Sequence, residues 1–394
     1  MDLLVRRIGR LHPIATPVIT DAALLIRDGV IAWLGPERDL PASLSDTPEL
    51  DAAGRTITPG FVDAHTHLVW AGSRREEFVA RLAGQSYDGG GIRTTVAATR
   101  AATDEELLAS ATTRAHTALD NGTTTMEIKT GYGLTRHDEL RLLNVIAGLN
   151  RTLPMHIDAT YLGAHVVPES VERTAYVDEV VDTLPHAHAA GARWCDVFCD
   201  EGVFTLQETR RILEAAADVG LGLRLHAEEI AHTGAAGLAA ELNCASADHL
   251  EHVTEADARA MAAAGVVGVL LPTVTLSLRT FAFGQVETLK KANVEIALAT
   301  DCNPGTSWCE SMPYVIQLAC LVYGLSIEEA LRAATLGGAH ALRLADAGHL
   351  AKRARGDLAI LDVEHEADLV AHLGSTPVSD TVIAGQVWQR PTHS

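Results

Sequence analysis

The segment ITPGFVDAHTH, residues 57–67, joins an apolar run to two histidines, and this pattern decides the fold. The body of the segment suits a buried β-strand, because it is short, largely apolar and opened by Pro59-Gly60. Seven later segments also have strand-like bodies, and most of them end in polar or ionisable residues. They are GTTTMEIKTGYG (122–133), DATYLGAH (158–165), CDVFCDEGVF (195–204), LRLHAEE (223–229), SADHLEH (246–252), VVGVLLP (266–272) and EIALATDCNPG (295–305).

Helix-like segments separate these apolar runs. One is expected to begin at Asp104 and to stop at Gly122, and another covers residues 206–220. Strands that alternate with helices favour parallel βα units. Eight such strands predict an α/β fold built on a (β/α)₈ TIM barrel, whose active site would lie at the carboxyl ends of the strands.

The two ends of the chain differ from this middle part. Residues 22–35 hold two apolar runs around Asp28-Gly29, and residues 380–389 repeat the pattern around Ala384-Gly385. Both patterns predict tight β-hairpins. We therefore expect a small β-sandwich domain made from residues 1–58 and 345–394, with the barrel in residues 59–344.

Composition narrows the range of partners. The formal net charge of −20 argues against binding to nucleic acid or to an anionic membrane surface. No uncharged apolar run approaches the roughly 18 residues that a membrane span needs. Six cysteines are too few for a secreted disulfide framework of this size, so a cytoplasmic location is expected, with Cys195 and Cys199 as core residues.

Four ionisable residues at strand ends predict a metal site. His65 and His67 stand two apart on one strand, so both side chains can face the barrel mouth. His226 and Asp301 end two other strands that would reach the same opening. Three imidazoles and a carboxylate suit Zn²⁺, and they also accept Fe²⁺ or Mn²⁺.

A second pair of histidines with the same spacing serves as a comparison. His186 and His188 lie in LPHAHAAGARW, which is helical or loop-like. On a helix these two rings would diverge by about 200°. We therefore expect this pair to lie on a solvated surface.

Several motifs of the chain resemble those of a known family. The motifs PGFVDAHTH, LRLHAEE, SADHLEH and LATDCNPG resemble the amidohydrolase superfamily. The motifs GGGIRTTVAATRAA, GTTTMEIKTGYGL, TYLGAHVVP and DVFCDEGVF resemble, more narrowly, the imidazolonepropionase family of histidine degradation. The resemblance covers nearly the whole chain and implies a barrel of the amidohydrolase type with a composite terminal β domain.

The resemblance also implies a reaction and a set of site residues. The reaction is hydrolysis of the cyclic amide of 4-imidazolone-5-propanoate to N-formimidoyl-L-glutamate. One metal ion is implied rather than two, because the fourth strand carries no lysine to bridge a pair of ions. Divalent zinc is favoured, with Fe²⁺ or Fe³⁺ as alternatives. The ligands would be His65, His67, His226 and Asp301, and the catalytic residues Glu229, His249 and Asp301. The substrate would be bound by Arg74, Tyr87, Tyr132, His165, Asn303, Gly305 and Thr306.

Several neighbouring residues are assigned to other roles. Arg75 is expected to face solvent, and Glu228 is a better choice than Glu229 for a surface salt bridge. The family further implies a homodimer. The sequence departs from the family pattern in a shorter segment after Tyr87, in Thr273 where glycine is expected, and in Thr306 where serine is usual.

Two other functions stay open at this point. A related mononuclear amidohydrolase or deaminase could act on another nitrogen heterocycle. A barrel that has lost catalysis could serve in assembly instead. Arg74 and the GYGL and GAH motifs favour a ligand with a carboxylate, and the intact ligand set argues against loss of catalysis.

Overall fold

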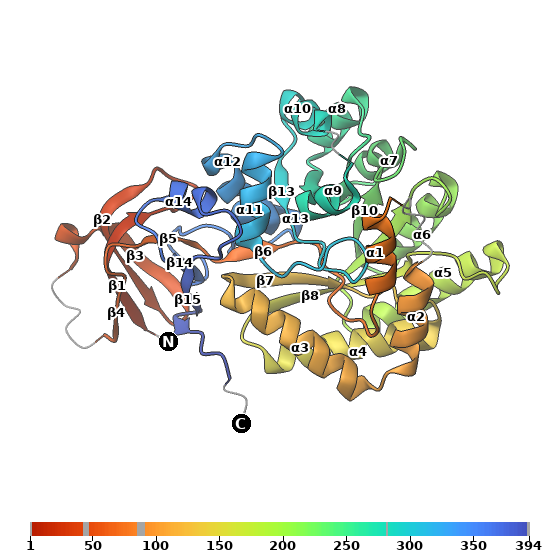
Figure 1. Ribbon diagram of the computed structural model, residues 1–394, viewed down its shortest axis with the longest axis horizontal. Coiled ribbons are helices and arrows are strands. Elements are labelled where there is room, and N and C mark those ends of the chain that lie inside the picture. Colours follow the sequence, from red (N-terminus) through yellow and green to blue (C-terminus); the bar gives the residue numbers. More distant parts are fainter. Residues whose placement is uncertain (1, 42–46, 85–90, 281–282, 392–394) are drawn as a thin grey trace.

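The part of the chain that the structure describes forms two eight-stranded sheets, one all parallel and one mixed. The computed structural model describes residues 2–41, 47–84, 91–280 and 283–391 (Figure 1). The parallel sheet comes from the middle of the chain and the mixed sheet from both ends. Figure 1 shows the mixed sheet at one side of the molecule and the ring of helices around the parallel sheet at the other.

The parallel sheet is the predicted barrel, and its strands follow one another in sequence order. Each predicted strand is present, and every neighbouring pair is parallel. The strands are β6 (Phe61–Asp63), β7 (Thr123–Lys129), β8 (His156–Ala164), β9 (Trp194–Cys199), β10 (Gly222–Ala227), β11 (Ser246–His249), β12 (Val267–Leu270) and β13 (Ile296–Leu298).

The ends of the first and last barrel strands meet and close the barrel. Beyond β6 and β13, Thr66 pairs with Cys302 in a parallel bridge. The backbone N–H of Asp301 donates to the carbonyl of His65 at 3.0 Å, and that of His67 donates to the carbonyl of Cys302 at 3.0 Å. Closure therefore places two predicted ligands of the first strand beside the predicted ligand of the last.

Helices surround the barrel, and their starts agree with the sequence signals. Thr103 forms a capping box with Glu106 at the start of α3, and Thr205 forms one with Glu208 at the start of α6. The helices of this part are α1 (Arg75–Leu82), α2 (Gly91–Ala101), α3 (Asp104–Asp120), α4 (Arg136–Thr152), α5 (Arg173–Ala189), α6 (Leu206–Asp218), α7 (Ala235–Glu241), α8 (Glu255–Ala264), α9 (Pro272–Leu278), α10 (Gly284–Ala292), α11 (Met312–Leu321), α12 (Ile327–Arg332) and α13 (Gly338–Ala341), with a π-helical turn at Ala333–Gly337.

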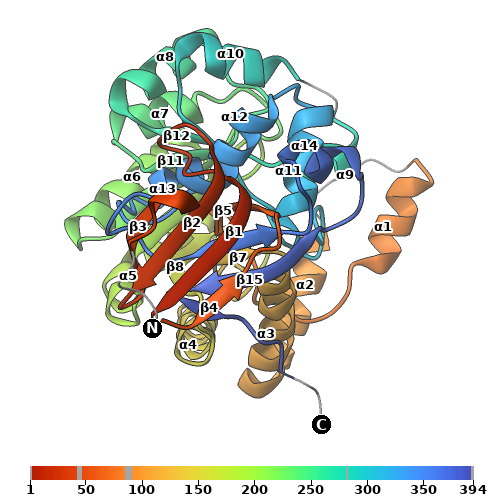
Figure 2. The ribbon, with the colours of Figure 1, turned by 90° about the vertical axis from the view of Figure 1, so that its left-hand side faces the viewer.

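The mixed sheet unites the two chain ends, as Figure 2 shows from its open side. Strand β14 pairs antiparallel with β5, and β5 pairs parallel with β1, so the C-terminal strands continue the N-terminal ones. Its strands are β1 (Leu3–Leu11), β2 (Ile19–Arg27), β3 (Val30–Pro36), β4 (Glu49–Asp51), β5 (Thr56–Pro59), β14 (Leu358–Leu361), β15 (Val378–Ile383) and β16 (Gln386–Val387), accompanied by the short helices Glu37–Asp39 and α14 (Glu366–Ala371).

Both predicted hairpins are present in this sheet. Asp28 and Gly29 have φ of 50° and 79°, and Ala384 and Gly385 have φ of 48° and 81°. Positive φ at both central residues is the signature of the type I′ turn, whose twist suits a two-residue hairpin. Apolar side chains from both chain ends, among them Val5, Ile57 and Ile360, share one core beneath the sheet.

The two sheets suggest where the chain divides. We propose the boundaries 1–58, 59–344 and 345–394, because β5 ends and β6 begins around Gly60, and β14 is the next strand after the barrel. Among the described residues no helix has both the length and the apolar character that a membrane span requires.

Candidate metal centre and active site

Four side chains converge at the carboxyl end of the barrel, where they come from the ends of three strands. They are the predicted ligands His65, His67, His226 and Asp301, and each is at most 3% exposed. Oδ1 of Asp301 lies 3.4 Å from Nε2 of His65 and 3.4 Å from Nε2 of His67. Nε2 of His226 lies 3.4 Å from Nε2 of His67. These short distances link the four side chains, which take part in two overlapping clusters of possible metal ligands, His65–His67–Asp301 and His65–His226–His249.

The spacing of these atoms fits a divalent ion. Four ligand atoms placed tetrahedrally at 2.0–2.1 Å from Zn²⁺ lie roughly 3.3 Å from one another. His65 Nε2 and Asp301 Oδ1 are both buried and have no hydrogen-bond partner. Burial of such atoms is costly unless something binds them, so the residues fit a metal ion that these atoms would hold.

The protonation of the histidines also suits a cation. Burial lowers the pKa of His65 and of His67 well below the usual range, and the ammonium of Lys129 lowers that of His65 further. Both rings are therefore neutral at pH 7 and offer a nitrogen lone pair. Burial raises the pKa of Asp301 well above its usual range, although the hydrogen bond from Asn303 and the charge of Lys129 lower it.

Neighbouring groups hold the ligand side chains in place. Nδ1 of His65 hydrogen-bonds Oδ2 of Asp248 at 2.6 Å, and Nδ1 of His226 lies 3.0 Å from Oδ2 of Asp196. The amide nitrogen of Asn303 donates to Oδ2 of Asp301 at 2.9 Å. These contacts leave Nε2 of each histidine and Oδ1 of Asp301 available to bind an ion.

The backbone is unusual at two strand ends beside this centre. Asp301 has φ of 47° and His249 has φ of 80°, a region that residues with a side chain seldom adopt. Such conformations persist where surrounding contacts hold them, and they gather at functional sites.

The two predicted proton-transfer residues lie next to the metal centre. The ring centroid of His249 is 5.3 Å from that of His226, and Nδ1 of His249 lies 3.8 Å from Oε2 of Glu229. Burial raises the pKa of Glu229 well above its usual range, and the nearby carboxylates of Glu251 and Asp301 raise it further. Glu229 is therefore a carboxyl group that holds a proton readily.

The expectation for the adjacent Glu228 is wrong. We expected a surface salt bridge, but Glu228 has no exposed surface, and its Oε1 reaches only as near as 3.8 Å to the ring of the exposed His232. Its φ of 60° turns the chain sharply at this position. Its Oε1 accepts hydrogen bonds from the backbone N–H of Gly234 at 3.1 Å and of Ala236 at 3.4 Å, at the start of α7. Glu228 thus holds the N-terminus of a helix, while Glu229 faces the site.

The predicted substrate residues surround the metal centre on its open side. The ring of His165 stacks on that of His67 with centroids 5.3 Å apart, and Tyr132 lies 5.4 Å from His165. Nδ1 of His165 donates to the carbonyl of Gly131 at 2.9 Å. This bond directs the second nitrogen of His165, Nε2, toward the cavity beside His67.

The loop after β13 is organised around Asn303. The carbonyl oxygen of its side chain accepts hydrogen bonds from the backbone N–H groups of Gly305 and Thr306, each at 2.8 Å. Thr306 keeps the hydroxyl that the family pattern requires. The predicted contact Tyr87 lies outside the described residues.

Arg74 is buried, with 5% of its surface exposed, whereas Arg75 is exposed. The Arg74 guanidinium already binds a carboxylate of the protein, because its Nε and Nη2 donate to the two oxygens of Glu77 at 2.9 and 2.7 Å. A carboxylate ligand would therefore share Arg74 with Glu77.

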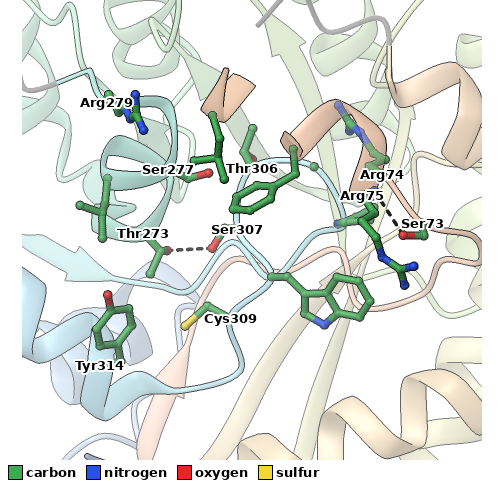
Figure 3. Close-up of a pocket in the computed structure, with 16 residues that line it drawn as sticks. Ser73, Arg74, Arg75, Thr273, Ser277, Arg279, Thr306, Ser307, Cys309 and Tyr314 are labelled. Carbon is green, nitrogen blue, oxygen red and sulfur yellow. Dashed lines mark hydrogen bonds between the residues drawn. The ribbon is translucent and has the colours of Figure 1, made fainter. Parts of the chain in front are cut away.

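Two adjoining cavities lead to this centre. The inner one, about 40 Å³, is lined by His67, Tyr132, His165, Glu229 and Asp301 among others. The outer one, about 630 Å³, lies among α1, α9 and the loop after β13. Arg74 and Thr306 line both, so the cavities adjoin. Figure 3 shows Arg279 on the opposite side of the outer cavity from Arg74.

Thr273, the departure from the expected glycine, lies at the wall of the outer cavity. Its hydroxyl donates to the carbonyl of Thr300 at 2.9 Å and accepts from the hydroxyl of Ser307 at 2.8 Å, the bond drawn in Figure 3. The threonine therefore ties the start of α9 to the loop that carries Asn303 and Thr306.

Sequence reasoning missed some residues of the site. Ile92 and Phe198 also line the inner cavity, and Asp196 and Asp248 hold two of the histidines. A signal was available for the two aspartates, because each stands inside a strand that is otherwise apolar. Nothing in the sequence marks Ile92 or Phe198 as different from core residues.

Comparison with known proteins agrees with this geometry. The model of the amidohydrolase family matches residues 56–388. A protein of Syntrophobacter fumaroxidans named imidazolonepropionase is 45% identical over 375 residues, which cover 91% of this chain and 88% of its own. A second protein with this name, from Mycolicibacterium smegmatis, is 46% identical over 375 residues, which cover 94% of this chain and 92% of its own.

Solved structures show the same fold at lower sequence identity. A triazine hydrolase variant superposes with a TM-score of 0.77 at 18% identity, over 98% of this chain and 94% of its own. An adenosine deaminase from Xanthomonas campestris with bound zinc superposes with a TM-score of 0.74 at 20% identity, over 98% of this chain and 92% of its own. Together with the family match, these findings establish that the chain belongs to the amidohydrolase family and, within it, to the imidazolonepropionases.

Proposed function

We propose that this protein hydrolyses 4-imidazolone-5-propanoate to N-formimidoyl-L-glutamate. The observation that carries the proposal is the 45% identity to a protein named imidazolonepropionase over 91% of the chain. The convergence of His65, His67, His226 and Asp301 in one cavity supports it, because hydrolysis of an amide at neutral pH needs an activated water.

We further propose that one zinc ion is held by these four residues, with iron as the alternative. Three imidazole nitrogens and one carboxylate oxygen form a set that zinc prefers and iron accepts. A bound divalent ion would lower the pKa of a water and polarise the amide carbonyl of the ring. The protein supplies the neutral imidazoles of His65 and His67 and the buried surroundings that favour this chemistry.

Glu229 is assigned the proton transfer. Its carboxylate would accept the proton of the attacking water and then give it to the ring nitrogen as the C–N bond of the amide breaks. Burial raises the pKa of Glu229, so its carboxylate binds a proton more strongly than an exposed carboxylate would, which favours uptake of the water's proton. His249, 3.8 Å away, would hold the attacked oxygen.

Arg74 is assigned the propanoate of the substrate. A guanidinium can bind a carboxylate through two hydrogen bonds, and the −20 charge of the chain makes such a local cation necessary. Tyr132, His165 and the hydroxyl of Thr306 line the same inner cavity and would contact the ring. The outer cavity would serve as the entrance, because it shares Arg74 with the inner one.

The direct test is hydrolysis of freshly generated 4-imidazolone-5-propanoate by the purified protein, with metal quantified in the same sample. We expect turnover in proportion to bound metal. Turnover of guanine or cytosine, without any of imidazolonepropionate, would favour the alternative of a related deaminase. The proposal also includes a homodimer, which light scattering on the purified protein would test.

A further inference from the structure

Beneath the metal centre lies a cluster of five buried ionisable side chains to which the proposed reaction assigns no role. They come from four strands of the barrel, none has exposed surface, and their formal charges are three negative and two positive. The cluster consists of Glu127 and Lys129 on β7, Asp196 on β9, Arg224 on β10 and Asp248 on β11.

Lys129 is at the centre of this cluster. Its Nζ lies 2.7 Å from Oδ2 of Asp196, 2.9 Å from Oε1 of Glu127 and 3.7 Å from Oδ2 of Asp248. Burial alone would lower the pKa of Lys129, but the carboxylates of Asp196 and Glu127 outweigh burial and raise it. The side chain is therefore an ammonium ion at pH 7.

Two of the carboxylates around Lys129 also contact the histidines of the metal centre. Oδ2 of Asp248 binds Nδ1 of His65 at 2.6 Å, and Oδ2 of Asp196 lies 3.0 Å from Nδ1 of His226. These are the same oxygen atoms that face the ammonium. Asp196 also accepts a hydrogen bond from the backbone N–H of His226 at 3.1 Å, through its other oxygen.

Because Lys129 fixes these oxygens, it also affects the two imidazoles. A carboxylate facing Nδ1 favours the tautomer with the proton on Nδ1, which leaves the lone pair on Nε2. Nε2 is the atom that each ring would offer to the ion. Without the ammonium, Asp196 and Asp248 would repel each other, and Asp196 would lose the cation that lies 2.7 Å from the oxygen facing His226.

We propose that Lys129 is a positioning residue for the metal centre, acting through Asp196 on His226 and through Asp248 on His65. The inference rests on the proposed metal-dependent function, since it assumes that these histidines hold an ion. β7 provides none of the four predicted ligands, yet one ammonium on this strand links ligands from two other parts of the barrel.

Arg224 plays a different part in the cluster. Its guanidinium reaches Oδ2 of Asp248 at 3.3 Å, but its shorter bonds go to the carbonyls of Ala341 at 2.9 Å and Ala64 at 2.7 Å. These bonds tie the barrel to α13 and to the backbone before His65. Arg224 therefore cannot replace Lys129 between the two aspartates.

The test compares Lys129→Met with a control that disturbs a partly buried ion pair elsewhere. Asp158, on β8, is 5% exposed and pairs with Arg193 at 2.5 Å. Its other side-chain contacts are with His156 and Trp194, and neither is a predicted ligand. The readouts are the dissociation constant for Zn²⁺, by competition with a chelator, the visible spectrum of the Co²⁺-substituted protein, and Tm.

We expect Lys129→Met to raise the Zn²⁺ dissociation constant by about 10- to 100-fold, the range found when residues that support metal ligands are replaced. The Co²⁺ spectrum should change as well, because the geometry around the ion changes. Asp158→Asn should lower Tm and leave both metal readouts at their wild-type values. Lys129→Met with wild-type zinc affinity and an unchanged Co²⁺ spectrum would overturn the inference.

A second pair of variants covers the case in which Lys129→Met does not fold. Asp196→Asn and Asp248→Asn keep the shape of each side chain and remove its charge, so each should weaken zinc binding. Folded variants with wild-type affinity would overturn the inference equally. Because zinc affinity is measured without substrate, a protein that binds zinc tightly but leaves imidazolonepropionate unchanged would refute the proposed function and not this role of Lys129.

Discussion

The two His-X-His pairs of this chain share a spacing and differ in everything else. His65 and His67 follow β6, are buried, and have ring centroids 5.3 Å apart. His186 and His188 lie in the last turn of α5, and both are exposed. Residues two apart face the same way on an extended strand and diverge on a helix. The same spacing therefore predicts a chelating pair only where the backbone is extended and other strand ends can supply more ligands.

The largest effect is expected from His67→Ala. Loss of this ring removes one predicted ligand atom and leaves Oδ1 of Asp301 with one imidazole contact at 3.4 Å, from His65, in place of two. Metal content should fall to near zero, and kcat/KM should fall by roughly 10³-fold or more, since a metal ion contributes several kcal/mol to such a reaction. Metal analysis and kinetics on the same sample check this. A variant with full metal content would contradict the ligand assignment.

Glu229→Gln should separate proton transfer from metal binding. The amide keeps the shape of the side chain but cannot accept the proton of the water, so kcat should fall by about 10²- to 10⁴-fold. Metal content should stay at the wild-type level. Steady-state kinetics with metal quantification provide the check. The matched control is Glu228→Gln, whose main effect should be a lower Tm and not a lower kcat.

Arg74→Ala should act mainly on substrate binding. Removing a charge-assisted hydrogen bond costs about 1.5–3 kcal/mol, so KM should rise by roughly 10- to 100-fold with bound metal unchanged. Arg75→Ala, one residue along and exposed, should change neither quantity. If both variants raise KM equally, the rise reflects the local charge and not a bond from Arg74.

The smallest effect is expected at the second histidine pair. The double variant His186→Ala and His188→Ala should keep full metal content and activity. Its stability should change by less than about 0.5 kcal/mol for each substitution, as is usual for exposed positions. Loss of metal in this variant would remove the distinction between the two pairs.

Much of this arrangement is predictable from the sequence, because the barrel repeats one simple pattern. Each of the eight apolar runs forms its strand, and capping residues such as Thr103 and Thr205 set the starts of the helices. The four predicted ligands come together because parallel strands of a closed barrel end at one face. No knowledge of side-chain packing is required for either result.

The parts that were missed depend on the tertiary structure. Glu228 and Glu229 are neighbours of identical chemistry, and only the φ of 60° at Glu228 decides which of them faces the site. The pairing of Arg74 with Glu77 could have been anticipated from their spacing of three on a helix start. Glu127 and Lys129 also gave a signal, since two charged residues alternate within a strand whose neighbours are apolar.

The central claim is that metal held by the first histidine pair and its partners drives hydrolysis of imidazolonepropionate. The most direct measurement follows this reaction with the purified protein, again after chelation, and again after zinc is restored. We predict turnover that disappears with the metal and returns at about one ion per chain. Unchanged turnover in the chelated, metal-free protein would contradict the account.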